Sequence, residues 1–126
     1  MLVYPSTVDV IEANKIALQL TLDKHPHKLI RSAAGIQHLI DEIRKDEAKG
    51  LTYQAARFIK QFTVEHFFGG ANHRTAYLIT LQFLTQNGMR LKTEQPKAVD
   101  EFMNEIGAKE IEKVQEWIEQ YLVHRP

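Results

Sequence analysis

The chain has 126 residues, of which 44% are hydrophobic and 25% charged, the size and composition of one ordinary globular domain. Its 16 basic residues balance its 16 acidic ones, which argues against direct nucleic-acid binding or a purely electrostatic attraction to an anionic membrane. The absence of cysteine excludes disulfides, thiolate metal sites and thiol nucleophiles.

The charges are distributed unevenly along the chain. Residues 51–93 carry five basic and one acidic side chain, whereas residues 94–126 carry four basic and eight acidic ones. The middle segment therefore favours an anionic ligand. The sequence shows neither a signal-peptide pattern nor a run of about 18 apolar residues, so we expect one cytoplasmic domain over 1–126 with no membrane span.

The first part of the chain contains two segments with helical periodicity. Ser6 and Asp9 form the pattern of an N-terminal helix cap, and apolar residues then recur at helical spacing until the histidine–proline pair at 25–26. A second apolar stripe covers residues 30–43 and is followed by a charged segment that Gly50 closes. These patterns predict two amphipathic helices.

The middle of the chain predicts two helices separated by a break. The first carries Phe58, Phe62 and His66 at four-residue steps, which places His66 at the end of a buried face. Residues 75–84 of the second are apolar nearly all round, a pattern typical of a central buried helix. The Asn-Gly pair at 87–88 is expected to end it.

The last part of the chain predicts a connector and two further helices. Residues 89–93 form a short extended connector, Pro96 opens a helix that Gly107 closes, and residues 111–122 form the last helix. No segment alternates convincingly between apolar and polar residues. The sequence therefore predicts an all-α bundle of about six helices with a central buried helix.

The segment between the third and fourth helices combines three features of a phosphate site. Gly69 and Gly70 allow backbone N–H groups to form a concave nest, and the following helix start adds unpaired donors at the positive end of its dipole. Arg74 adds a planar charged fork. Asn72 fits a helix cap or a donor to the same anion, and His66 offers an imidazole, the commonest general base.

Each of these features also has an ordinary structural explanation. Two glycines usually form a turn, an asparagine before a helix usually caps it, and an arginine in a first turn is usually solvated. A histidine at the end of an apolar row usually belongs to the core. Their occurrence together, in the basic segment, favours an anion-binding site.

The same segment resembles the signature of the Fic/Doc family, His-x-Phe-x-(Asp/Glu)-(Gly/Ala)-Asn-(Gly/Lys)-Arg, and above all its Doc (death-on-curing) branch, which continues into Thr-Ala. The matching residues are His66, Phe68, Ala71, Asn72, Arg74, Thr75 and Ala76. The likeness extends through Leu-x-Phe-Leu-x-x-Asn-Gly at 81–88 and weakens in the closing helices.

The resemblance implies a Fic/Doc-like fold and a transferase that uses ATP or another nucleotide. It assigns His66 as the general base for an acceptor hydroxyl and Phe68 as the buried residue that fixes the loop. It assigns phosphate binding to Gly69, Gly70, Ala71, Asn72, His73 and Arg74. Doc proteins transfer a phosphoryl group to a translation elongation factor, whereas most Fic proteins transfer AMP; a large residue after the asparagine, here His73, favours the Doc mode.

The resemblance also implies how such a protein is controlled. Self-inhibited Fic proteins carry Ser/Thr-x-x-x-Glu, and no serine or threonine of this chain has glutamate four residues later. Control would therefore come from a partner, as the antitoxin controls Doc. The sequence leaves a homo-oligomer open.

Gly70 departs from the family pattern, because it stands where the family has the acidic Mg²⁺ ligand. Mg²⁺ prefers carboxylate and phosphate oxygens, so we predict no metal ligand in the loop. Mg²⁺ would then bind through the nucleotide and water alone, another segment would supply a carboxylate, or the protein no longer transfers anything. Three hypotheses remain: a Doc-like transferase, a catalytically degenerate protein that acts in binding or regulation, and a helical domain whose likeness is accidental.

Overall fold

The structure is a computed structural model that describes residues 1–20, 29, 31–92 and 96–124. Its main elements are α1 (Thr7–Leu20), α2 (Ala33–Arg44), α3 (Leu51–Val64), α4 (Asn72–Gln86), β1 (Met89–Leu91), α5 (Pro96–Glu105), α6 (Ile111–Tyr121) and β2 (Leu122–His124). Two short 3₁₀ turns, η1 (Glu47–Lys49) and η2 (Ile106–Ala108), precede α3 and α6. The described residues thus form a mostly helical structure with six α-helices, as the sequence predicts.

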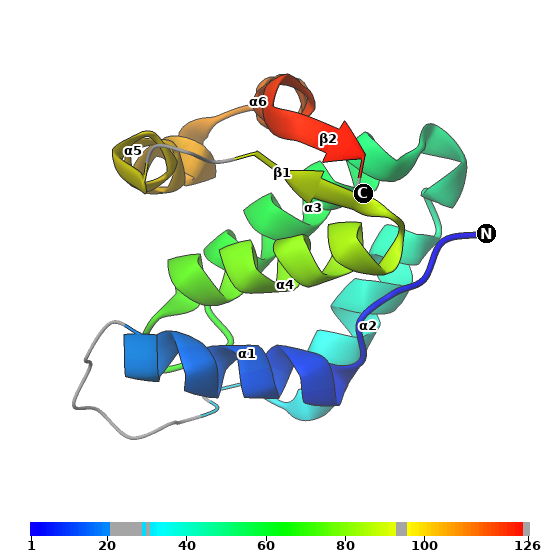
Figure 1. The fold of residues 1–126 in the computed structure, drawn as a ribbon. Coiled ribbons are helices and arrows are strands. Elements are labelled where there is room, and N and C mark those ends of the chain that lie inside the picture. The colour runs from blue at the N-terminus through cyan, green and yellow to red at the C-terminus, as the bar shows by residue number, and fades with distance from the viewer. Residues whose placement is uncertain (21–28, 30, 93–95, 125–126) are drawn as a thin grey trace.

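Figure 1 shows how these elements are arranged. α4 crosses the middle of the molecule and packs against both α1 and α3. α6 packs on α3, β1 packs on α4, and α2 contacts both α1 and α3. The connection between α3 and α4, which carries the candidate site, lies at the end of the molecule away from both termini (Figure 1).

The first helix begins where the sequence predicts, whereas the second begins at Ala33, three residues after the start of the predicted stripe. The Asp9 backbone N–H donates to Ser6 Oγ at 3.1 Å, and the Ser6 N–H donates to Asp9 Oδ2 at 2.8 Å. This reciprocal pair confirms the predicted cap of α1. Ser32 caps α2 by accepting a hydrogen bond from the Gly35 N–H at 3.1 Å. The predicted end of the first helix, at 25–26, lies outside the described residues.

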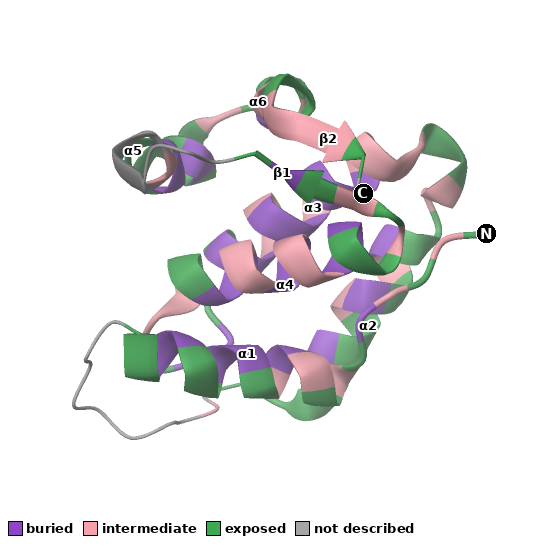
Figure 2. Ribbon diagram, viewed as in Figure 1, coloured by how far each residue is buried: buried purple, intermediate pink, exposed green. Residues whose placement is uncertain are grey.

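Aromatic rings form the centre of the core. Phe58 of α3 is fully buried, and its ring centroid lies 4.8 Å from that of Phe83 in α4 and 5.9 Å from that of Phe62. The Tyr4 ring lies 5.4 Å from the Phe83 ring and ties the N-terminal segment to both helices. Buried residues line the facing sides of α1 and α4 in Figure 2.

α4 is central, and none of residues 75–84 is exposed, although four of the ten are only partly buried. It has six buried residues, whereas α3 has seven. Tyr77, Leu78 and Leu81 are only partly buried, because the elements that contact α4 do not enclose it completely. α3 is the more buried helix because α2, α4 and α6 all pack on it.

A small sheet corrects the all-α prediction. β1 pairs with β2 in antiparallel register, with Arg90 opposite Val123 and Leu91 opposite Leu122. Leu122, predicted to lie in the last helix, is the first residue of β2. Strands of three residues are too short to show the alternation by which a strand is recognised. Gly88 precedes β1 with a left-handed backbone (φ 82°), which confirms the predicted end of α4.

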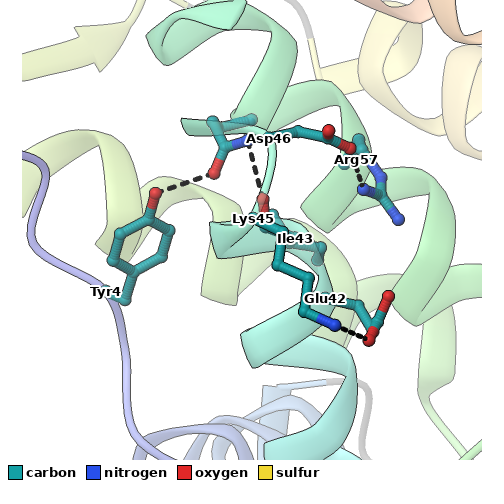
Figure 3. A network of polar contacts seen from close by, with 7 residues as sticks. Tyr4, Glu42, Ile43, Lys45, Asp46 and Arg57 are labelled. Atoms are coloured by element: carbon teal, nitrogen blue, oxygen red, sulfur yellow. Dashed lines mark hydrogen bonds and ion pairs between the residues drawn. The ribbon is translucent and has the colours of Figure 1, made fainter. Parts of the chain in front are cut away.

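A buried glutamine connects three separate segments (Figure 3). The Tyr4 hydroxyl donates to Gln54 Oε1 at 2.8 Å, and Gln54 Nε2 donates to the Ile43 carbonyl at 2.8 Å. Burial raises the pKa of Tyr4 and the nearby Glu47 carboxylate raises that pKa further, while Arg44 lowers it. The relay fixes the N-terminal segment to the end of α2 and the start of α3, far from the α3–α4 connection.

Two ion pairs flank this relay in Figure 3. The Arg57 guanidinium lies 2.8 Å from the Asp46 carboxylate, and Lys45 Nζ lies 2.8 Å from Glu42. The hydrogen bond from Lys45 lowers the pKa of the Glu42 carboxyl.

Within the described parts of the chain, no helix combines the length and the apolar character needed to cross a bilayer.

Candidate functional site

The connection between α3 and α4 is anchored by two consecutive buried phenylalanines. Phe67 and Phe68 are both nearly inaccessible, and the Phe67 ring centroid lies 5.7 Å from that of Phe62. Both residues lie beyond α3, which ends at Val64, so the connection itself carries them into the core. Phe68 is buried, as the resemblance implies.

His66 differs from its predicted place. It lies beyond the end of α3, is exposed, and has a left-handed backbone with φ 49°. The row of Phe58 and Phe62 therefore does not continue to His66. The prediction that His66 ends a buried face is wrong because the chain turns to bury Phe67 instead.

The Asn72 side chain forms two hydrogen bonds with the backbone of Phe68 in the same connection. Its Nδ2 donates to the Phe68 carbonyl at 2.9 Å, and its Oδ1 accepts from the Phe68 N–H at 3.2 Å. Asn72 is the first residue of α4, and Ala71 occupies the cap position. The Asn72 side chain thus bonds to the loop backbone at Phe68, and Asn72 is not the cap residue of α4.

Asn14 holds the same loop from α1, and sequence reasoning missed it. This fully buried residue donates from Nδ2 to the Gly70 carbonyl at 2.9 Å and to Thr75 Oγ1 at 3.0 Å. The Thr75 hydroxyl in turn donates to the Ala71 carbonyl at 2.7 Å. A sequence signal exists, because Asn14 interrupts the buried row of Val10 and Leu18 at four-residue spacing.

Arg31 holds the other end of the loop and was also missed. Its guanidinium donates to the Glu65 carbonyl at 2.9 Å, forms an ion pair with the Glu65 carboxylate, and lies over the Phe67 ring. Leu29 and Phe68 form an isolated antiparallel bridge beside this contact. Nothing in the sequence around Arg31 indicated these contacts, which depend on how α2 packs.

The left-handed residues of the loop are not the predicted glycines. Ala71 has φ 57° and ψ 30°, and among the residues that the structure describes His66 is the other non-glycine residue with positive φ. Gly69 and Gly70 are not among the residues with positive φ. A nest built on the two glycines is therefore not formed; the loop turns at Ala71, where the chain enters α4.

Ala71→Gly is expected to raise the free energy of unfolding by about 0.5–1 kcal/mol. Glycine removes the cost of a left-handed backbone, which is about 1–2 kcal/mol for an L-residue. Glycine also makes the unfolded chain more flexible, which offsets about 0.4–1 kcal/mol of this gain. Denaturant unfolding would measure the change. Ala34→Gly, at an exposed right-handed position in α2, is the matched control and should instead lose about 0.5–1 kcal/mol. Equal losses in both variants would contradict the assignment of strain to Ala71.

A pocket opens beside the start of α4. It has a volume of about 310 Å³ and lies between the first turns of α4 and the described side chains of α5. Its lining residues are His73, Arg74, Tyr77, Val99, Met103 and Asn104. The pocket thus brings together His73 and Arg74, two of the predicted phosphate-binding residues, while His66 and Asn72 do not line it.

The electrostatics of this helix start favour an anion. Ala71 offers no side-chain acceptor to the first turn, and the first N–H groups of an α-helix precede its internal hydrogen bonds. Arg74 is exposed in that turn, where the positive end of the helix dipole disfavours a cation. No hydrogen bond or ion pair joins its side chain to any described residue. An anion in the pocket would compensate both positive charges.

The same surroundings do not fit a divalent cation. Gly70 has no carboxylate, its carbonyl accepts from Asn14, and the acid nearest to it in the sequence, Glu65, is paired with Arg31. No group of three histidine, aspartate or glutamate side chains in the described residues could hold a metal ion. The residues around Gly70 therefore do not supply the carboxylate oxygens that Mg²⁺ prefers.

Neither a scan against models of known protein families nor a search of curated proteins found a match to this chain. The geometry of the α3–α4 connection and the sequence signature within it are therefore the features that point to a function.

Proposed function

We propose that the start of α4 binds the phosphate groups of ATP or a related nucleotide, and that the protein is a Doc-like transferase acting on a protein hydroxyl. One observation carries the proposal: Arg74 lies at an uncapped helix start, without a partner among the described residues, in a pocket of about 310 Å³. Guanidinium groups bind phosphate through two parallel hydrogen bonds, and His73 lies beside it in the same pocket.

The transfer step has a balanced form. The acceptor hydroxyl oxygen bonds to the γ-phosphorus, its proton passes to the His66 imidazole, and the bond from that phosphorus to the bridging oxygen breaks to release ADP. In the AMP-transfer variant the attack is on the α-phosphorus and pyrophosphate leaves. His66 is exposed and accessible to a protein substrate. A translation factor as the target and an antitoxin as the inhibitor belong to the same proposal.

A second candidate is a protein that binds nucleotide without transferring any part of it. Gly70 supplies no carboxylate, and Glu65 is engaged by Arg31. Transfer would then lack the charge neutralisation that a metal ion provides to the transferring group. On this hypothesis the pocket serves in regulation, and nucleotide binding changes the interaction of the protein with a partner.

Arg74→Ala is expected to weaken ATP binding by about 1.5–3 kcal/mol, the usual value of a hydrogen bond to a charged group. Isothermal titration calorimetry in the absence of divalent cations would measure it. Arg90→Ala removes an exposed arginine from β1, outside the pocket, and is the matched control with little expected effect. If the wild-type protein binds no ATP, or if both variants lose affinity equally, the pocket is not a phosphate site.

Gly70→Asp separates the two candidates. Placed beside bound phosphates, the new carboxylate repels them in chelator and supplies an oxygen ligand when Mg²⁺ is present. We therefore expect the variant to bind ATP more weakly than wild type in chelator and more tightly with Mg²⁺. Gly69→Asp, one residue away, is the control that should not show this reversal.

Transfer itself is tested by incorporation of labelled phosphate or AMP into translation factors. The second candidate predicts very low wild-type transfer and a gain in Gly70→Asp that His66→Ala abolishes. Strong wild-type transfer would show that the missing acid is dispensable. A folded Gly70→Asp protein without any Mg²⁺-dependent gain in binding would show that position 70 does not lie beside the phosphates.

A further inference from the structure

His66 stands between two residues that a single arginine holds. Arg31 donates to the Glu65 carbonyl at 2.9 Å and pairs with the Glu65 carboxylate. On the other side of His66, the Arg31 Cζ lies 4.8 Å from the centroid of the Phe67 ring. The backbone N–H of Arg31 also donates to the Phe67 carbonyl at 3.4 Å. Both chain neighbours of His66 are thus fixed by the same residue.

The backbone of His66 needs this support. Its φ of 49° lies in the left-handed region, which residues other than glycine rarely occupy and leave unless the surroundings hold them there. Asn72 and Asn14 fix Phe68 and Gly70, which both follow His66 in the chain. Arg31, in contrast, contacts both the residue before His66 and the residue after it.

The ion pair alone does not explain this role. The Arg31 and Glu65 side chains are 47% and 36% exposed, and exposed ion pairs contribute little to stability. What the guanidinium provides is geometry, because one planar group contacts a carbonyl, a carboxylate and an aromatic ring together. A lysine ammonium would keep the charge but could not combine these three contacts.

We propose that Arg31 is the positioning residue of His66: by holding Glu65 and Phe67 it fixes the left-handed turn that leaves the imidazole exposed. The inference rests on the proposed function, in which His66 accepts the proton, and it adds a residue from outside the loop. Arg31 contacts Glu65 and not the residues that line the pocket. We therefore expect it to affect the position of the His66 base and not the affinity for nucleotide.

The first test needs no nucleotide. A left-handed residue has a short intraresidue distance between its amide and α protons, so the nuclear Overhauser effect between them reports φ directly. In Arg31→Ala and Arg31→Lys we expect the effect at His66 to fall on the order of two-fold, as the turn becomes a mixture of conformers. Arg57→Ala, which removes the ion pair between Arg57 of α3 and Asp46, should leave it unchanged.

Each result of this test decides the proposal. An unchanged signal in Arg31→Ala would overturn it, and so would a full wild-type signal in Arg31→Lys, because charge alone would then suffice. Should Arg31→Ala fail to fold, Arg31→Lys decides the question in the same way, with a fall in the signal supporting the proposal. Ala71, the second left-handed residue, is the internal reference whose signal should persist in both variants.

The second test uses transfer kinetics and separates this proposal from the proposed function. We expect Arg31→Ala to lower kcat about ten- to a hundredfold while the Kd for ATP, set by Arg74, stays within about two-fold. An unchanged kcat would overturn the proposal. If wild type binds no ATP, the proposed function fails, and the signal at His66 still shows whether Arg31 positions that residue.

Discussion

Phe58→Ala is expected to lower the free energy of unfolding by about 3–5 kcal/mol, the range for truncating a buried phenylalanine. Phe58 is fully buried and its ring contacts those of Phe62, Phe83 and Tyr4, which come from α3, α4 and the N-terminal segment. Truncation leaves a cavity that these rings cannot fill without moving three elements. Urea unfolding at neutral pH would measure the loss.

Val64→Ala is the matched control for Phe58→Ala. It removes apolar atoms from the same helix at a position that is 42% exposed, so the expected change is within about 0.5 kcal/mol. A loss of less than about 1 kcal/mol in Phe58→Ala would mean that the aromatic cluster repacks around the deleted ring. The packing of α3 on α4 would then be more adaptable than the ring contacts indicate.

Asn14→Asp is expected to lower the free energy of unfolding by about 3–5 kcal/mol at pH 7, as for other unpaired buried charges. The substitution replaces the Nδ2 donor by a carboxylate oxygen that faces the Gly70 carbonyl. The Thr75 hydroxyl could donate to the carboxylate only by giving up its hydrogen bond to the Ala71 carbonyl. The variant protein should also release the loop that carries His73 and Arg74.

The loss in Asn14→Asp should depend on pH in one direction. Burial raises the pKa of a carboxyl group, and a raised pKa contributes stability at low pH that is lost as the pH increases through the folded value. The variant should therefore lie closer to wild type at pH 4, where the protonated acid can donate to Gly70, than at pH 7. Gln86→Glu, an exposed amide-to-acid change, should show little of this dependence. Equal deficits at both pH values would contradict the hydrogen bond from Asn14.

Much of the helical framework was predictable because local chemistry sets it. The Ser6–Asp9 cap and the turn at Gly88 depend on residues within a few positions of each other, and the structure confirms both. The end of α3 could not be predicted in the same way. Whether the row of Phe58 and Phe62 continues to His66 is decided by the burial of Phe67, a long-range packing effect.

The candidate site was predictable in its residue types and not in its internal contacts. Sequence reasoning placed Arg74 at a helix start, and the structure opens a pocket there. The sequence prediction assigned the turn to the two glycines, whereas Ala71 has the left-handed backbone. The next residue, Asn72, forms a hydrogen bond back to Phe68 across this turn. Asn14 and Arg31 come from segments distant in the chain, and only the packing of α1 and of the segment before α2 brings them to the loop.

The pocket is lined by residues of two helices, α4 and α5, and the single tryptophan lies next to α5. One wall belongs to α4 in the core, while α5 is attached through Phe102, whose ring stacks on Trp117 of α6 at 4.0 Å between centroids. Trp117 is the single tryptophan of the chain, and Phe102 adjoins Met103 in the pocket lining. A ligand that moves α5 relative to α6 would change the surroundings of the Trp117 ring. Intrinsic fluorescence would then follow occupancy in the unlabelled protein.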